Sequence, residues 1–251
     1  MMSSSQQNQQ RQQLQNPLHS ILLPSKTAAL TRTPSPATHL NVKPLVLPSR
    51  QHRDFVAFTL QDILTPQECQ SLIERSEQFG YEIALVNAGQ DHAGIHAPGY
   101  RDSLRALIDD PLTAAELWTR VQHHVPAVYQ NRPVVGMNER LRFLKYSPGD
   151  QFQPHMDGEF RRRDGSGQVT KLTIQFYLNE GCEGGATTFL DENYFWKAEQ
   201  EQQAKAQTLP VECKVGQALI FQHDLVHEGS KVLEGVKYVI RSDILYGPAN
   251  Y

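Results

Sequence analysis

Apolar and polar positions alternate with two different periods along this chain, and the helical period comes first. Thr65–Glu68 predicts the start of a helix that extends to about Phe79, because the threonine hydroxyl and the glutamate carboxylate can cap the first turn. A second helix is predicted from Pro111 to about His124, behind an aspartate cap at Asp110. Between the two helices, residues 80–109 show no period that assigns an element.

Strand-like segments dominate the rest of the chain. These runs are short, rich in branched and aromatic residues and separated by glycine and proline, and they cover residues 55–60, 140–143, 169–178, 186–190, 218–221 and 237–246. Many short strands behind N-terminal helices predict a mainly β protein with a jelly-roll core. Residues 191–209 are predicted to be a polar, partly helical insertion within the β region.

The first part of the chain differs from the rest in composition. Residues 1–50 are rich in Gln, Ser and Pro and have no sustained period, so we expect a disordered extension there. Because they are basic and lack acidic residues, an organelle transit peptide is an alternative reading, and a Gln-rich interaction segment is another. The expected domain covers residues 54–251, with helical support over about 54–135 and the β core over about 136–251.

Charge and cysteine content exclude several classes of protein. Six basic residues and no acidic residue precede Asp54, so the remainder carries −9 of a total net charge of −3, which argues against nucleic-acid binding by the core. No apolar run approaches the ~20 residues that a membrane-spanning helix needs. The three cysteines are widely spaced and favour neither a disulfide scaffold nor a thiolate zinc site, so the cytoplasm or another reducing compartment is expected.

Three residues are candidate metal ligands. His155 and Asp157 are two apart, which places both side chains on the same face of a strand. His227 follows an apolar strand and precedes a turn, which makes it the preferred third ligand, with His223 as a rival. Two histidines and one carboxylate on one face of an octahedron suit non-haem Fe(II) and dioxygen chemistry.

A cosubstrate for such chemistry needs a cation of its own. A ketoacid that chelates the iron leaves its far carboxylate in a dry cavity, where a fixed positive charge and hydroxyl donors must meet it. Lys237 at the start of its strand can supply that charge, and Arg241, four residues further on the same strand face, is the rival. Tyr146 and Tyr177 are the candidate hydroxyl donors.

These blocks together resemble a known enzyme family. From about Arg140 to Tyr246 the chain is similar to the iron and 2-oxoglutarate (2OG) dependent dioxygenases of the prolyl 4-hydroxylase type. The similarity rests on Tyr146-x-x-Gly149-x-x-x-x-x-His155-x-Asp157, Phe176–Asn179, Glu183–Phe189, Pro210–Gly216 before Ala218–Phe221, His227, and Lys237 in Gly235–Tyr238.

The resemblance carries expectations about fold and site. It implies a double-stranded β-helix, iron on His155, Asp157 and His227, and 2OG held at its far carboxylate by Lys237, with Tyr146 and Tyr177 in its pocket. The cofactors implied are Fe(II), 2OG and O₂, and ascorbate is a further candidate. Arg241-Ser242-Asp243 is a departure from the collagen-type enzymes.

The expected function is hydroxylation of a substrate C–H bond with release of succinate and CO₂. The substrate is a peptide, with peptidyl proline as one candidate, or a small molecule. Arg161–Arg163, close behind the metal motif, could hold an acidic substrate, although a solvated loop is the preferred reading. The alternative function is a non-catalytic, cupin-like binding or sensing module.

Overall fold

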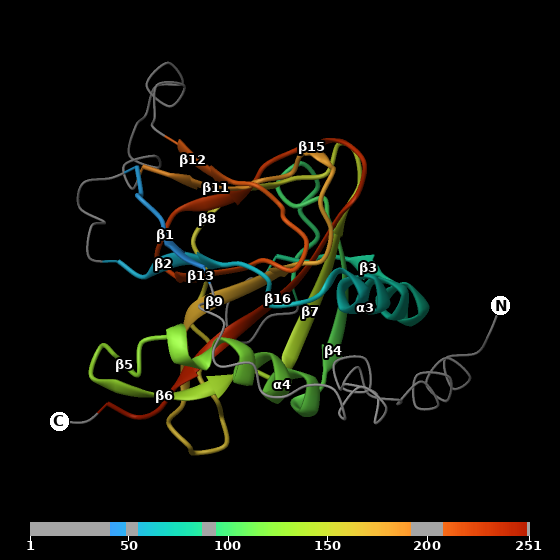
Figure 1. Cartoon of the computed structure of the whole chain (residues 1–251). Coiled ribbons are helices and arrows are strands. Elements are labelled where there is room, and N and C mark those ends of the chain that lie inside the picture. Colours follow the sequence, from blue (N-terminus) through green and yellow to red (C-terminus); the bar gives the residue numbers. More distant parts are fainter. Residues whose placement is uncertain (1–40, 49–54, 87–93, 192–207, 250–251) are drawn as a thin grey trace.

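A large sheet and a smaller sheet face each other in the computed structural model, which describes residues 41–48, 55–86, 94–191 and 208–249 (Figure 1). Side chains from both sheets pack into one cluster between them, including Tyr177, Leu219 and Val239 from the large sheet and Phe189 and Val211 from the small one. Two antiparallel sheets enclosing a shared interior confirm the predicted mainly β fold with a double-stranded β-helix core.

The large sheet has the strand order β1-β2-β13-β9-β16-β7-β4-β3, and β6 pairs with both β5 and β16. Its strands are β1 (Val42–Pro44), β2 (Ala57–Leu60), β3 (Glu82–Ile83), β4 (Leu104–Asp109), β5 (Val128–Tyr129), β6 (Arg132–Met137), β7 (Arg140–Tyr146), β9 (Val169–Tyr177), β13 (Ala218–Gln222) and β16 (Lys237–Tyr246). The smaller sheet has the order β12-β11-β14-β8, and a separate pair joins β10 to β15. These strands are β8 (Phe152–His155), β10 (Glu183–Gly184), β11 (Thr187–Leu190), β12 (Thr208–Val211), β14 (His227–Gly229) and β15 (Val232–Glu234).

Both predicted helices form, and they cover the outer face of the large sheet (Figure 1). Helix α3 runs from Pro66–Phe79 and has the predicted capping box between Thr65 and Glu68. Helix α4, Pro111–Val121, is capped by Asp110 and continues as a short 3₁₀ turn, η2 (Gln122–His124). The apolar faces of α3 and α4 pack on the large sheet and form the main core with it.

The alternation of side chains along each strand separates this core from the cavity between the two sheets. On β9, Leu172, Ile174 and Phe176 pack in the core under the helices, whereas Gln175 lies in the lining of the cavity between the sheets. On β16 the same alternation places Lys237, Val239, Arg241 and Asp243 in that lining. Because side chains on a strand alternate between its two faces, the core positions of each strand fix which of its residues enter the cavity.

Some elements differ from the sequence prediction. Residues 80–109, to which the pattern assigned no element, contribute β3 and β4 to the edge of the large sheet, and β6 adds a strand at the boundary between the predicted helical and β regions. Leu107 faces the cavity rather than the core, which breaks the apolar alternation that would have revealed β4.

Part of the predicted extension also joins the sheet, because β1 pairs with β2. Residues 1–40, and residues 192–207 of the predicted insertion, lie outside the described residues. Within the described segments, no helix has both the length and the apolar character to span a membrane.

Candidate metal centre and cosubstrate cavity

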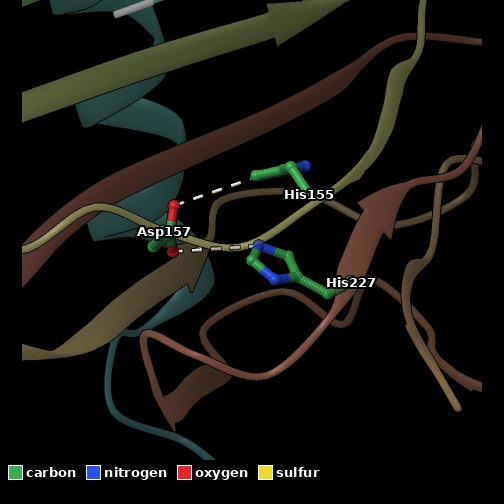
Figure 2. A group of neighbouring side chains, drawn as sticks. All are labelled: His155, Asp157 and His227. Carbon is green, nitrogen blue, oxygen red and sulfur yellow. Dashed lines mark ion pairs between the residues drawn. The ribbon is translucent and has the colours of Figure 1, made fainter. Parts of the chain in front are cut away.

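Three candidate ligands meet where β8 and β14 lie side by side. His155 is the last residue of β8, Asp157 follows it by two residues, and His227 is the first residue of β14. The register of the two strands pairs His155 with His227. The ligand atoms of the three side chains all lie within 4.8 Å of one another. Figure 2 shows the two imidazoles directed at the carboxylate, with Nε2 of His155 4.0 Å and Nε2 of His227 3.8 Å from its oxygens.

Backbone carbonyls orient both imidazoles for metal binding. Nδ1 of His155 lies 2.8 Å from the carbonyl oxygen of Gln153, and Nδ1 of His227 lies 2.9 Å from that of Leu225. A hydrogen on Nδ1 that is donated to a carbonyl leaves the lone pair on Nε2, which is the arrangement of metal-bound histidines. Burial lowers the pKa of His155 to about 3 and also lowers the pKa of His227, so both rings are in the neutral form that binds a metal.

Aromatic rings hold the two histidines in place. Phe152 stacks on the ring of His155 with their centroids 3.6 Å apart, and the ring of Phe221 meets the ring of His227 edge-on at 4.7 Å. Apolar rings on these sides keep water away from the imidazoles and restrict their rotation.

Asp157 is held by a buried arginine. Nη2 of Arg241 lies 2.8 Å from one oxygen of the Asp157 carboxylate, and the Thr173 hydroxyl donates a hydrogen bond to the other oxygen. Burial by itself would raise the pKa of Asp157, but Arg241 and the neighbouring histidines hold that pKa well below its usual value. Asp157 is therefore ionised, and the ionised form is the one in which a carboxyl group can bind a metal.

The two candidate anchors for the cosubstrate have different surroundings. Arg241 also lies 3.2 Å from Asp243, so its charge is shared between two carboxylates. Lys237 is 4% exposed, and its Nζ donates to the carbonyl oxygen of Gly185 at 2.6 Å. Within the described residues no carboxylate pairs with Lys237.

Both candidate tyrosines surround Lys237. Its Nζ lies 5.2 Å from the ring centroid of Tyr146 and 5.7 Å from that of Tyr177. The Tyr177 hydroxyl donates to Thr187 at 2.8 Å, and the Thr187 hydroxyl donates to the side-chain carbonyl of Gln175 at 3.1 Å. Burial raises the pKa of Tyr177 well above its usual value, so this hydroxyl keeps its proton.

One cavity of about 710 Å³ connects the ligand triad to Lys237. Tyr146, Gln175 and Thr187 contribute to its lining, and so does Arg101, which comes from the segment between β3 and β4. The sequence analysis did not identify Thr173 and Gln175. Both lie on β9 at alternate positions with Tyr177, so strand alternation places them on the same face as that candidate tyrosine. No sequence signal marks Arg101.

Two further sequence candidates fall outside this arrangement. His223 does not join the ligand group: its backbone carbonyl accepts a hydrogen bond from the Asp157 amide at 2.8 Å, and its ring lies 3.5 Å from Asp243. Residues Arg161–Arg163 do not line the cavity. Arg161 pairs with Glu159 and Arg162 pairs with Glu139, as expected for a surface loop.

Comparisons with known proteins agree with this geometry. Residues 141–242 match the model of the 2OG-Fe(II) oxygenase superfamily. Over these residues the chain is similar to that superfamily of Fe(II)- and 2OG-dependent oxygenases. A comparison with curated protein sequences gives no match.

Solved structures share the fold at low sequence identity. A prolyl hydroxylase from Trichoplax adhaerens, solved with a peptide of hypoxia inducible factor, has a TM-score of 0.56 at 14% identity, covering 79% of this chain and 86% of its own. A viral collagen prolyl hydroxylase from Paramecium Bursaria Chlorella virus-1 has a TM-score of 0.50 at 17% identity, covering 74% and 94%. HygX from Streptomyces hygroscopicus, solved with nickel and 2OG, has a TM-score of 0.50 at 16% identity, covering 81% and 88%.

Proposed function

We propose that this protein is a dioxygenase that hydroxylates a C–H bond of its substrate, with conversion of 2OG and O₂ into succinate and CO₂. The observation that supports this most directly is the convergence of His155, Asp157 and His227 on one cavity that also contains the buried ammonium of Lys237. A peptide, including one with a proline target, and a small molecule both remain substrate classes for the assay.

The residues present fit Fe(II). Two imidazole nitrogens and one carboxylate oxygen are the donors of the facial triad found in non-haem Fe(II) oxygenases. Each imidazole is already oriented through its Nδ1, and the carboxylate is already ionised. Bound Fe(II) would supply the oxidising chemistry with O₂ and 2OG, while His155, Asp157 and His227 would hold it.

The residues present also fit 2OG. We propose that Lys237 binds its far carboxylate, because a buried ammonium without a carboxylate partner is costly unless an anion completes the pair. Arg241 is the weaker candidate, since Asp157 and Asp243 already neutralise it. Tyr146 and Tyr177 would shield the ion pair from water on two sides of Lys237.

Succinate release tests the metal ligands. In an assay with Fe(II), 2OG and a substrate panel, run with and without ascorbate, the Asp157→Ala variant is expected to produce no succinate. Asp109→Ala is the matched control, because Asp109 is an exposed partner of Arg140 outside the cavity. Unchanged turnover in Asp157→Ala would overturn the assignment and would favour the non-catalytic binding module.

Cosubstrate binding tests the anchor. Under anaerobic conditions with Fe(II), the weak visible band of the 2OG chelate gives the Kd, and Lys237→Met is expected to raise that Kd about 10- to 100-fold. Lys145→Met, on β7 and paired with Glu77 at 2.7 Å, removes the same charge outside the cavity and should leave the Kd unchanged. An unchanged Kd in Lys237→Met would overturn the choice of Lys237 as anchor.

Domain extent and location are the remaining parts of the proposal. We propose residues 54–251 as the enzymatic domain, supported by β1, so removal of residues 1–40 should preserve 2OG turnover. The three cysteines form no disulfide, which supports a reducing compartment such as the cytoplasm. Imaging of the full chain and of the truncated chain, each with a fluorescent tag, tests both this location and organelle targeting by residues 1–50.

A further inference from the structure

We infer that Arg101 binds a carboxylate of the substrate, so that the enzyme acts on an acid rather than on a neutral compound. This inference rests on the proposed function, whose site it completes. It concerns a residue of the cavity that neither the metal nor 2OG requires.

A stacked pair of rings, Phe152 and His155, connects Arg101 to the candidate metal centre. Arg101 forms a bridge with Phe152 at the start of β8, and its guanidinium lies 4.5 Å from the centre of the Phe152 ring. This ring also stacks on the imidazole of His155. A group bound to Arg101 would therefore lie beside the metal centre.

The charge of Arg101 has no protein counter-ion within the described residues, where no carboxylate pairs with it. Its Nη1 donates to the carbonyl oxygen of Leu85 at 3.2 Å, and its buried Nε has no hydrogen-bond partner there. A planar guanidinium with free donors matches the two oxygens of a carboxylate.

The other arginines of the cavity are already paired. Arg142 and Arg241 share Asp243, while Arg105 pairs with Glu82 and Arg140 pairs with Asp109. Lys237 is assigned to 2OG. Arg101 is thus the remaining cation, among the described lining residues, that an incoming anion could neutralise.

The electrostatic surroundings of Arg101 favour the same class of ligand. Burial, together with Arg241 and Arg105, lowers the pKa of Arg101 despite opposing effects from Tyr146 and Asp157. A bound carboxylate would relieve this unfavourable environment.

Matched acids and amides test the inference. The panel contains N-acetylated amino acids and short peptides, each as the C-terminal acid and as the primary amide, together with capped peptides that differ only by Asp against Asn or Glu against Gln. The first set identifies a terminal or small-molecule carboxylate, and the second identifies a side-chain carboxylate. At least one acid should stimulate succinate release with a kcat/KM about 10- to 100-fold above that of its amide.

Variants connect that preference to Arg101. Arg101→Gln should raise the KM for the acid by about 10- to 100-fold, leave the Kd of 2OG within about twofold, and abolish the preference over the amide. Arg101→Lys, which keeps the charge, should restore part of the preference. Lys145→Gln removes a charge from β7 outside the cavity and should change neither the KM for the acid nor the preference for the acid over the amide. The unchanged Kd of 2OG also shows that Arg101→Gln folds.

Three results would overturn the inference. The first is equal activity with acids and with amides, and the second is an Arg101→Gln variant in which the Kd of 2OG rises but the KM for the acid does not. The third is a wild-type enzyme that turns over 2OG in the absence of substrate but is stimulated by none of the acids. Failure of the proposed function looks different. In that case the wild-type chain with Fe(II) would neither bind 2OG nor release succinate under any condition.

Discussion

Replacing Arg241 with methionine should destabilise the metal-free protein strongly. Arg241 contacts Asp157 at 2.8 Å, and the two side chains are 15% and 9% exposed. Without Arg241, Asp243 keeps Arg142 at 2.9 Å, but Asp157 keeps only the Thr173 hydroxyl and two neutral histidines. Loss of one partner from a buried ion pair costs about 3–5 kcal/mol.

The exposed pair between Arg140 and Asp109 is a matched control. It has the same 2.8 Å separation, but its side chains are 52% and 54% exposed. Water screens such a pair, so Arg140→Met should cost less than about 1 kcal/mol. For a domain of this size, the loss in Arg241→Met corresponds to a decrease in Tm of roughly 6–20 °C.

Thermal unfolding of EDTA-treated protein, followed by circular dichroism, measures both variants. Addition of Mn(II) should then raise the Tm of Arg241→Met more than that of the wild type, because the metal takes over neutralisation of Asp157. Equal losses for Arg241→Met and Arg140→Met would refute the argument from burial. An equal Mn(II) effect on Arg241→Met and the wild type would refute the link between Arg241 and the metal site.

Two further predictions concern a thiol and a glycine. The neighbouring Cys213 thiol lowers the pKa of Cys182, so alkylation of Cys182 by iodoacetamide should reach half its maximal rate at a lower pH than that of an ordinary thiol, and Cys213→Ala should move this midpoint upward. An unmoved midpoint would contradict the assigned cause. Gly216 has a φ of 76°, and a Cβ added at this position would lie 2.1 Å from the carbonyl oxygen of Leu64, so Gly216→Ala should cost at least about 2 kcal/mol in urea unfolding. Gly149→Ala, with a φ of 96° but open space around it, should cost less because it has the strain without the clash, and equal costs would contradict the steric argument.

Local features of the chain were readable from the sequence. The capping box at Thr65 and the aspartate cap at Asp110 depend on residues within one helical turn, and both helices begin where those caps predict. The strands β9, β13 and β16 follow from short-range alternation and β-branched content. His155 and Asp157 share a strand face because they are two residues apart.

The choice between Lys237 and Arg241 could not be made in this way. The two residues lie on the same face of β16, and the sequence gives both a positive charge there. Pairing between strands distinguishes them, because it places Lys237 opposite Tyr146, whereas the folded chain brings Arg241 against Asp157. Contacts between residues more than 80 positions apart decide which of the two cations is already neutralised.

The sequence by itself therefore determined the helices, most of the strands, the His-x-Asp pair and the family resemblance, since each depends on neighbours along the chain. The tertiary structure brings His227, which the sequence already favoured over His223, beside that pair. The tertiary structure alone decided that Arg241 is occupied by Asp157 and that Arg101 stays without a counter-ion among the described residues. Strand register decides which charged groups become neighbours, and burial sets the strength of the interaction between them. Neither follows from the local sequence pattern.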